Sequence, residues 1–169
     1  MSTVLLAGLR ASGKSTLAPL LSQATDVACA DLDDLTRDAL GCATVREAWD
    51  THGEPAFRAA ELDQLRGWLA GRTGGVIALG GGTPMIDGFA GLLGDGAVMV
   101  YLHAAPGVLR ARMADGDPDR PSLTGASALD EVESVYAVRD PVYRGLAAHV
   151  VDAEDRESAV LSRLLAVLA

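Results

Sequence analysis

The feature that most constrains this chain is a glycine-rich stretch near its amino end, Gly8-Leu9-Arg10-Ala11-Ser12-Gly13-Lys14-Ser15-Thr16, which fits the pattern G-x-x-x-x-G-K-[ST]. In such a loop, backbone N–H groups surround a β-phosphate, the lysine reaches the β- and γ-phosphates, and the hydroxyl binds Mg²⁺. An apolar run, residues 3–7, predicts a buried strand before the loop, and residues 14–24 predict a helix after it. The amino end of that helix would face the phosphates. The sequence therefore predicts a phosphate-binding loop, called the P-loop below.

A turn that merely joins a strand to a helix is the alternative. Lys14 is the only lysine in the chain, and the other thirteen basic residues are arginines. A compact ammonium group is thus kept at the one position where it must fit between phosphates. This favours phosphate binding. The nucleotide-binding residues predicted in the loop are Gly8, Ala11, Ser12, Gly13, Lys14, Ser15 and Thr16.

Short apolar runs alternate with helical patterns along the rest of the chain. The predicted strands are residues 3–7, 26–30, 74–79, 97–102 and 149–151. The predicted helices are residues 14–24, 35–40, 44–50, 55–69, 86–93, 106–114, 127–137 and 157–168. Strands that are almost entirely apolar suit a parallel sheet covered on both faces. With no repeat and no linker, we expect a single domain over residues 1–169, an α/β three-layer sandwich with a five-stranded parallel sheet.

Composition excludes several classes of function. The formal net charge is -9 over 169 residues, whereas nucleic-acid binders usually carry a basic patch. No apolar stretch approaches the ~20 residues of a membrane span, and the P-loop begins too early for a signal peptide. Two cysteines are too few for a disulfide framework. We therefore expect a cytoplasmic protein that binds neither nucleic acid nor membrane.

Charged and glycine-rich positions follow the predicted strands. Asp31 and Asp33 come after the second strand, where an extended backbone would place both carboxylates on one face. Asp33 or Asp34 could instead simply cap the next helix. Three glycines, residues 80–82, follow the third strand and indicate a backbone that something approaches closely. In open parallel sheets, ligands bind at the carboxyl ends of the strands.

Two further features lie outside the strands. Arg58 and Glu61 are three residues apart in a predicted helix, and a surface ion pair of little energetic worth is the plainer interpretation. Residues 115–125 are polar and rich in turn formers, which is typical of a lid or a binding loop.

Read together, these motifs resemble those of shikimate kinases. The resemblance rests on the P-loop, on Asp31-Leu32-Asp33, on Gly53-Glu54-Pro55-Ala56-Phe57-Arg58, on Gly80-Gly81-Gly82, on Arg120-Pro121 and on Arg139-Asp140-Pro141-Val142-Tyr143, and it covers essentially the whole length. It implies a P-loop fold like that of nucleoside-monophosphate kinases. The implied reaction transfers the γ-phosphoryl group of ATP to the 3-hydroxyl of shikimate, in the chorismate pathway to aromatic amino acids.

The resemblance also implies roles for residues. Asp33 matches the aspartate that binds the substrate hydroxyls and acts as base, while Asp31 joins Ser15 at Mg²⁺. Arg58 and Arg139 match the arginines that hold the carboxylate, beside the backbone of Gly80, Gly81 and Gly82. Arg120 matches a lid arginine that reaches the phosphates, and Arg110 matches one that lies over the adenine. The catalytic set is thus Lys14, Asp33 and Arg120, within a substrate-binding helical region near 31–61 and a lid near 114–126.

The residues themselves agree with this chemistry. Phosphoryl transfer needs positioning and charge neutralisation, which a lysine, a hydroxyl for magnesium, a carboxylate pair and an arginine can supply. Arg58 and Arg139 offer forked donors that suit a planar carboxylate. The expected ligands are ATP, Mg²⁺ and shikimate, and the chain is expected to be a monomer.

Three departures from the family pattern bear on these roles. Ala11 stands where the family commonly has glycine, and an extra residue near Gly41 makes Asp34 the fallback for Asp33. The lid is longer and carries three aspartates. Alternative functions are another small-molecule P-loop kinase, such as a gluconate or adenylylsulfate kinase, and a module that binds nucleotide without turnover. An acceptor without a carboxylate would leave Arg58 and Arg139 without a partner.

Overall fold

The computed structural model describes residues 2–71, 74–94, 96–114 and 131–169. The strands and helices it contains are, in chain order, β1 (Thr3–Ala7), α1 (Lys14–Thr25), β2 (Cys29–Asp31), α2 (Leu32–Ala39), α3 (Val45–Ala70), β3 (Gly75–Ala78), the 3₁₀ turns η1 (Thr83–Met85) and η2 (Ala90–Leu92), β4 (Ala97–His103), α4 (Pro106–Ala114), α5 (Val132–Leu146), β5 (His149–Asp152) and α6 (Glu157–Leu168).

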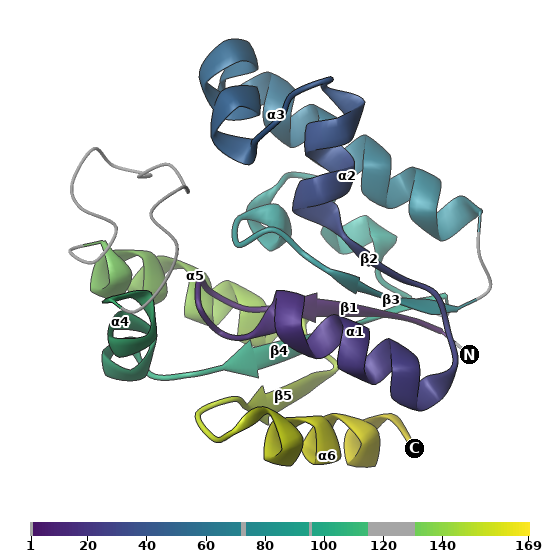
Figure 1. Ribbon diagram of the computed structural model, residues 1–169, viewed down its shortest axis with the longest axis vertical. Helices are drawn as coiled ribbons and strands as arrows, with labels where there is room; N and C mark the ends of the chain where they lie inside the picture. The colour runs from purple at the N-terminus through teal and green to yellow at the C-terminus, as the bar shows by residue number, and fades with distance from the viewer. Residues whose placement is uncertain (1, 72–73, 95, 115–130) are drawn as a thin grey trace.

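The five strands form one parallel sheet in the order β2-β3-β1-β4-β5 (Figure 1). From β1 the chain crosses toward β2, whereas from the neighbouring β3 it crosses toward β4. The loops after β1 and β3 therefore leave the same edge of the sheet in opposite directions. A divergence of this kind creates the crevice in which ligands bind in open α/β sheets. The P-loop follows β1, and the three glycines follow β3.

The sheet is covered on both faces, because alternate side chains of each strand point to opposite sides. Val4 and Leu6 of β1 pack with α1 and α6 in one apolar cluster. Leu5 and Ala7 of the same strand pack with α3, α5 and the η2 region in a second cluster. All five residues of β1 are buried, as a central strand of a three-layer sandwich requires. The predicted fold class is confirmed.

Helix boundaries differ from the predicted ones in four places. The helix predicted over residues 86–93 is wrong, because this segment has only 3₁₀ turns. The helices predicted over 44–50 and 55–69 form one element, α3, interrupted at Gly53 (φ 76°, ψ 163°). The helix predicted over 127–137 begins at Val132 and continues through Pro141 to Leu146.

The fourth difference concerns the aspartates after β2. Asp31 ends the strand with extended dihedral angles and caps α2, because its Oδ1 accepts the Asp33 N–H at 3.0 Å. The helix thus begins at Leu32 rather than Leu35, and the proposed sharing of one strand face by Asp31 and Asp33 is wrong. Asp33 lies instead in the first turn of α2. Carboxylates at the amino end of a helix also interact favourably with its dipole.

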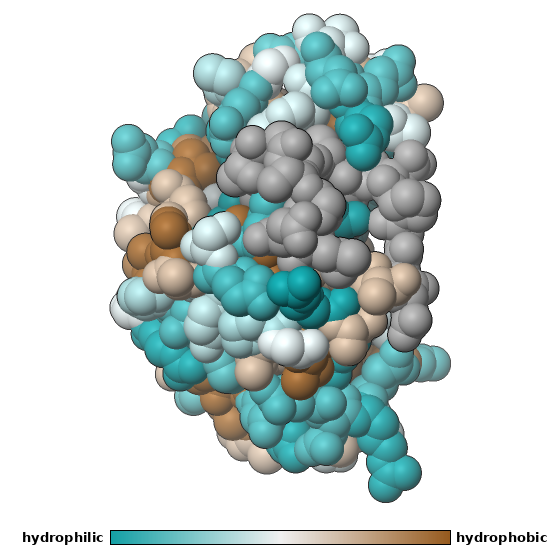
Figure 2. Space-filling model, turned by 90° about the vertical axis from the view of Figure 1, so that its left-hand side faces the viewer, coloured by the Kyte–Doolittle hydropathy of each residue, from teal (hydrophilic) through white to brown (hydrophobic). Residues whose placement is uncertain are grey.

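The carboxyl edge of the sheet lies to the left in Figure 1, and Figure 2 shows that side of the molecule with a largely hydrophilic surface. In Figure 1, helices α2 and α3 lie above the sheet, and helices α4 and α5 lie at its left-hand end. Among the described residues, no helix combines the length and apolar character needed to cross a bilayer.

Candidate active site

The P-loop wraps around the side chain of its own lysine. Lys14 is 6% exposed, and its Nζ donates to the carbonyl oxygens of Gly8 at 2.8 Å and Leu9 at 3.0 Å. Gly13 caps α1 with φ 94°, and Ala11 has φ 63°. Both residues have left-handed backbone conformations, which cost glycine no steric energy and cost alanine roughly 1–2 kcal/mol. The loop path thus demands glycine-like geometry at Ala11, where the family commonly has glycine.

Ser15 and Asp31 meet at the start of α1. The Ser15 hydroxyl donates to Asp31 Oδ2 at 2.6 Å, and the other carboxylate oxygen caps α2. A hydroxyl and a carboxylate oxygen in contact beside a phosphate-binding loop are the ligand types that Mg²⁺ takes from a protein in nucleotide sites. No group of three or more His, Cys, Asp or Glu side chains that could hold a metal occurs among the residues described.

The structure separates the two aspartates between which the sequence left a choice. Asp33 lines a cavity, whereas Asp34 is exposed and pairs with Arg37 at 2.6 Å on the outside of α2. Neighbouring positions in a helix point about 100° apart, so only one of them can face the cavity. Asp33 is therefore the carboxylate positioned for a ligand.

The glycine turn after β3, residues 80–82, passes between charged side chains that a Cβ at its first or third position would overlap. A methyl group at Gly80 would overlap Glu61 Oε1 and lie 2.8 Å from Asp33 Oδ1. One at Gly82 would overlap the Arg58 guanidinium, and one at Gly81 would lie 3.5 Å from Arg139 Nη1. The first and third glycines are thus explained by the close approach of Glu61 and of two predicted substrate-binding residues, Asp33 and Arg58.

Glu61 is the fully buried centre of this arrangement. Its exposed fraction is 0%, Arg58 Nη1 donates to its Oε2 at 2.7 Å, and the Thr83 hydroxyl donates to its Oε1. Burial raises the pKa of the Glu61 carboxyl, although Arg58 and Thr83 act in the opposite direction. The interpretation of Arg58 and Glu61 as a surface ion pair is therefore wrong. The i, i+3 spacing correctly predicted that Arg58 and Glu61 form a pair. The burial of Glu61 depends on η1, whose Thr83 contacts it only in the folded chain.

Arg139 reaches the same turn from α5. Its Nη1 donates to the carbonyl oxygen of Gly81 at 2.6 Å, and the hydroxyl of Tyr143 donates to the same oxygen. Arg58 is also held by the ring of Trp49, whose centroid lies 5.0 Å from the guanidinium carbon. Both arginines are thus fixed by neighbours that leave part of each guanidinium facing the cavity.

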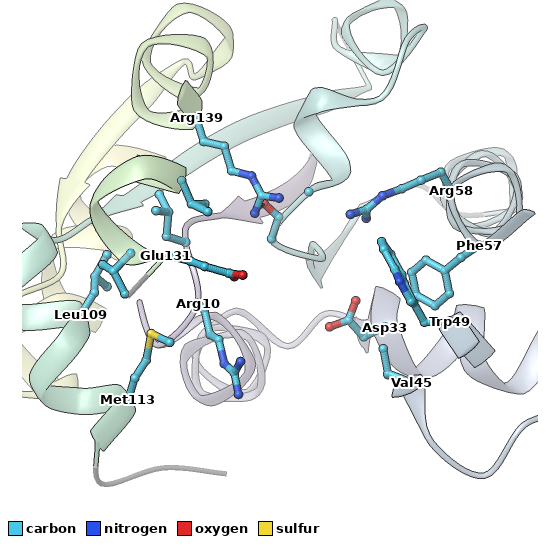
Figure 3. Close-up of a pocket in the computed structure, with 15 residues that line it drawn as sticks. Arg10, Asp33, Val45, Trp49, Phe57, Arg58, Leu109, Met113, Glu131 and Arg139 are labelled. Carbon is cyan, nitrogen blue, oxygen red and sulfur yellow. Dashed lines mark hydrogen bonds between the residues drawn. The ribbon is translucent and has the colours of Figure 1, made fainter. Parts of the chain in front are cut away.

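One open cavity joins these groups (Figure 3). Arg58 and Arg139 reach into it from opposite sides, with Asp33 below them in this view. Gly81 lines it beside Arg139 and Gly82 beside Arg58, and the P-loop contributes Leu9 and Arg10. The apolar part of the lining consists of Val45, Trp49, Phe57, Leu109, Met113, Val132 and Val135, and Glu131 completes the wall. A polar ligand with one apolar face and a carboxylate suits this mixture.

Of the two predicted nucleotide-binding arginines, the described residues include Arg110. Arg120 is outside the described residues, as is most of the predicted lid. Arg110 is half-exposed and pairs with Glu133 of α5 at 3.0 Å. Arg112 had no predicted role. Its Nη2 donates to the carbonyl oxygens of Ala153 at 2.8 Å and Glu154 at 3.0 Å. Its Nη1 donates to the carbonyl oxygen of Ala11 in the P-loop at 3.4 Å. Residues two apart in a helix point about 200° apart, so only one of these two arginines can face the P-loop.

Sequence reasoning also missed Glu61, Trp49, Tyr143 and Glu131 as parts of the site. Trp49 lies one helical turn after Val45, and both precede the break at Gly53. That spacing predicts a common face, but the cavity opposite that face is formed by α4 and α5, more than fifty residues further on.

The chain matches the family model described as shikimate kinase over residues 10–169. It is 36% identical to a shikimate kinase of Oleidesulfovibrio alaskensis over 176 aligned positions, covering 100% of this chain and 98% of that protein. It is 39% identical to a shikimate kinase of Rhodopirellula baltica, covering 89% of this chain and 81% of that protein.

Solved structures agree. A shikimate kinase from Bacteroides thetaiotaomicron superimposes with a TM-score of 0.86 at 26% identity, over 99% of this chain and 98% of that one. One from Acinetobacter baumannii, in complex with shikimate, gives 0.84 at 23% identity, over 99% and 94% of the two chains, and a gluconokinase from Sinorhizobium meliloti gives 0.63 at 19%, over 99% and 95%. The last two likenesses concern the fold alone. By its family model and by relatives that match along its whole length, this chain belongs to the shikimate kinase family.

Proposed function

We propose how the residues of this kinase divide the work of its reaction, the transfer of the γ-phosphoryl group of ATP to the 3-hydroxyl of shikimate. The observation that carries the proposal is the single cavity in which Asp33, Arg58 and Arg139 meet residues of the P-loop. A kinase needs its acceptor hydroxyl and the transferred phosphate within reach of each other, since most of the catalysis is positioning.

Arg58 and Arg139 bind the carboxylate of shikimate. Each charge-assisted hydrogen bond contributes roughly 1.5–3 kcal/mol, and a planar carboxylate matches the guanidinium fork. The backbone of Gly80, Gly81 and Gly82 is proposed to lie against the same ligand. Gly81 and Gly82 line the cavity, and Trp49 and Phe57 form its apolar wall. The two rings pack on each other with centroids 5.3 Å apart, which keeps that wall rigid.

Asp33 faces the hydroxyl that is phosphorylated. Its carboxylate either accepts the proton of this hydroxyl or orients the oxygen for in-line attack. Lys14 exchanges its two carbonyl partners, Gly8 and Leu9, for phosphate oxygens of ATP. That exchange costs little, because an ammonium group held by neutral acceptors gains charged ones.

Mg²⁺ fits the pair formed by Ser15 and Asp31. Both residues offer oxygen ligands in mutual contact at 2.6 Å, and Mg²⁺ in nucleotide sites takes one or two protein oxygens while phosphates and water supply the rest. The ion would neutralise phosphate charge during transfer.

Arg120 is proposed to reach the phosphates from a lid near 114–126, and residues 31–61 form the substrate-binding region of a single domain. Arg112 is a better candidate than Arg110 for the base of ATP, because it links the P-loop to the loop after β5.

The chain is proposed to act in the cytoplasm as a monomer with ATP and shikimate as its small-molecule partners. A net charge of -9 supports the absence of a nucleic-acid partner.

The test is a direct assay of ATP consumption by the purified chain with shikimate, gluconate or adenylylsulfate as acceptor. We expect turnover only with shikimate and Mg²⁺, with a phosphate monoester visible by ³¹P NMR. Turnover of gluconate or adenylylsulfate with none on shikimate would overturn the proposal. A single-turnover experiment excludes a module that only binds nucleotide if phosphate reaches shikimate.

A further inference from the structure

The carbonyl oxygen of Gly81 accepts two hydrogen bonds from α5. Arg139 Nη1 donates to it at 2.6 Å, and the hydroxyl of Tyr143 is the second donor. A carbonyl oxygen has two lone pairs, so this acceptor is fully used. The proposed function assigns Arg139 to the carboxylate of shikimate and assigns no role to Tyr143.

Tyr143 is held so firmly that its hydroxyl has a fixed position. The residue is 0% exposed and its ring meets the ring of Tyr101 edge-on, with centroids 5.3 Å apart at 89°. The hydroxyl of Tyr101 in turn donates to Asp140 at 2.9 Å. Burial raises the pKa of Tyr143 to about 12, which keeps its phenol a neutral donor at any working pH.

A guanidinium has five N–H groups, of which Arg139 uses one on Gly81. A bidentate grip on a carboxylate uses two, and aligning that pair with the ligand can turn the Nη1 N–H away from Gly81. If the guanidinium turns to the substrate, the peptide carbonyl of Gly81 would be left with no donor, unless a second one stays behind. Tyr143 is that second donor.

The same hydrogen bond orients a peptide plane. The Gly81–Gly82 peptide is trans, so the N–H of Gly82 points opposite to the Gly81 carbonyl. With the carbonyl directed at α5, that N–H is directed away from α5. Both glycines line the cavity between Arg58 and Arg139.

We propose that Tyr143 is a positioning residue for substrate binding, which holds the Gly81 carbonyl so that Arg139 can release it and grip the carboxylate of the acceptor. The inference rests on the proposed function for the identity of that acceptor. The hydrogen bond from Tyr143 to Gly81 is observed independently of the proposed function.

The variant that tests this is Tyr143→Phe, which removes the hydroxyl and keeps the packed ring. We expect the KM for shikimate to rise on the order of tenfold, the worth of one buried hydrogen bond. The kcat and the KM for ATP should change less than threefold. Tyr101→Phe is the matched control, because it removes the hydroxyl of the other ring of the same buried pair, and its KM for shikimate should stay within about twofold of the wild type.

A double-mutant cycle distinguishes positioning from general loosening. If Tyr143 acts through Arg139, Tyr143→Phe should raise the KM for shikimate far less in an Arg139→Ala background than in the wild type. Equal KM increases in both backgrounds would overturn the proposal, as would a loss of kcat with unchanged KM.

A readout without substrate separates this inference from the proposed function. The amide ¹⁵N of Gly82 shares a peptide group with the Gly81 carbonyl, so its NMR shift should move in Tyr143→Phe and not in Tyr101→Phe. If the wild type fails to phosphorylate shikimate, the proposed function fails, and the Gly82 signal still decides the role of Tyr143. If the Gly82 ¹⁵N shift does not change in Tyr143→Phe, or if this variant keeps the wild-type KM for shikimate, the role of Tyr143 is refuted and the proposed function still stands.

Discussion

At the scale of single residues, the site is built from charges that satisfy one another before any ligand arrives. Lys14 binds the carbonyls of its own loop, Ser15 binds Asp31, and Arg58 binds Glu61. Unpaired buried charges would cost several kcal/mol, so partners of this kind are needed for folding. Catalysis then consists of exchanging some of these partners for those of the substrates.

Lys14→Met tests the lysine at this scale. We expect kcat to fall at least a hundredfold, because a charge that stabilises the transferred phosphoryl group is lost, while the far-UV circular dichroism spectrum stays that of the wild type. Arg139→Ala is the comparison variant and should act mainly on the KM for shikimate. Small and equal effects of both substitutions would contradict the assigned roles.

Glu61 gives a prediction about pH. Its raised pKa means that the folded chain keeps this proton at pH values where the unfolded chain has lost it. The folded state then binds more protons, so the contribution of Glu61 to the free energy of unfolding is fully present below about pH 4, the ordinary range of a glutamate, and is lost as the pH rises through the raised pKa.

Urea unfolding of the wild type and of Glu61→Gln across a pH series measures this contribution. The difference, wild type minus variant, should fall with rising pH, since glutamine cannot titrate. Asp63→Asn, which removes an exposed carboxylate that pairs with Arg66 in the same helix, serves as the control. A difference that grows with pH would show that pairing with Arg58 outweighs burial.

At the scale of elements, α3 joins two halves of the site through one glycine. Val45 and Trp49 precede Gly53, and Phe57, Arg58 and Glu61 follow it. The φ and ψ angles of Gly53 lie in a region that is essentially restricted to glycine. The break turns the first two helical turns over the cavity, which a continuous helix would not do.

Gly53→Ala should therefore destabilise the chain by about 1–3 kcal/mol, through backbone strain rather than collision, because an added Cβ would meet only Pro55 at 3.9 Å. Gly67→Ala in the same helix is the matched control. Its Cβ would meet nothing within 4 Å, and alanine should stabilise a regular helix there by about 0.5–1 kcal/mol. Denaturant unfolding measures both, and equal signs would show that Gly53 is not strained.

The two arginines of α4 make a second prediction at this scale. Arg112→Ala should raise the KM for ATP severalfold, because it unties the P-loop from the loop after β5. Arg110→Ala, which removes only a half-exposed pair with Glu133, should change it less than twofold. The reverse order of effects would restore Arg110 as the nucleotide arginine.

At the scale of the whole molecule, elements far apart in the chain converge on one cavity, so its ligands should stabilise the entire fold. Shikimate or Mg²⁺-ATP at a hundred times its Kd should contribute about 2.7 kcal/mol, which raises the Tm by roughly 5–10 °C. Gluconate should give no shift. In Arg139→Ala the shift with shikimate should vanish and the shift with Mg²⁺-ATP should remain, and loss of both shifts would point to unfolding instead.

The sequence by itself determined the local chemistry of this protein. The strand, loop and helix of the P-loop, the alternation of five strands with helices, and the charged and glycine motifs are all read within short windows, where spacing alone sets which residues share a face. Only the tertiary structure decided which groups are buried and which meet. Glu61 became a buried centre, Asp33 rather than Asp34 turned to the cavity, and Tyr143 and Arg112 found partners some sixty and a hundred residues away, because burial and long-range contacts depend on how the layers pack and not on the neighbours in the chain.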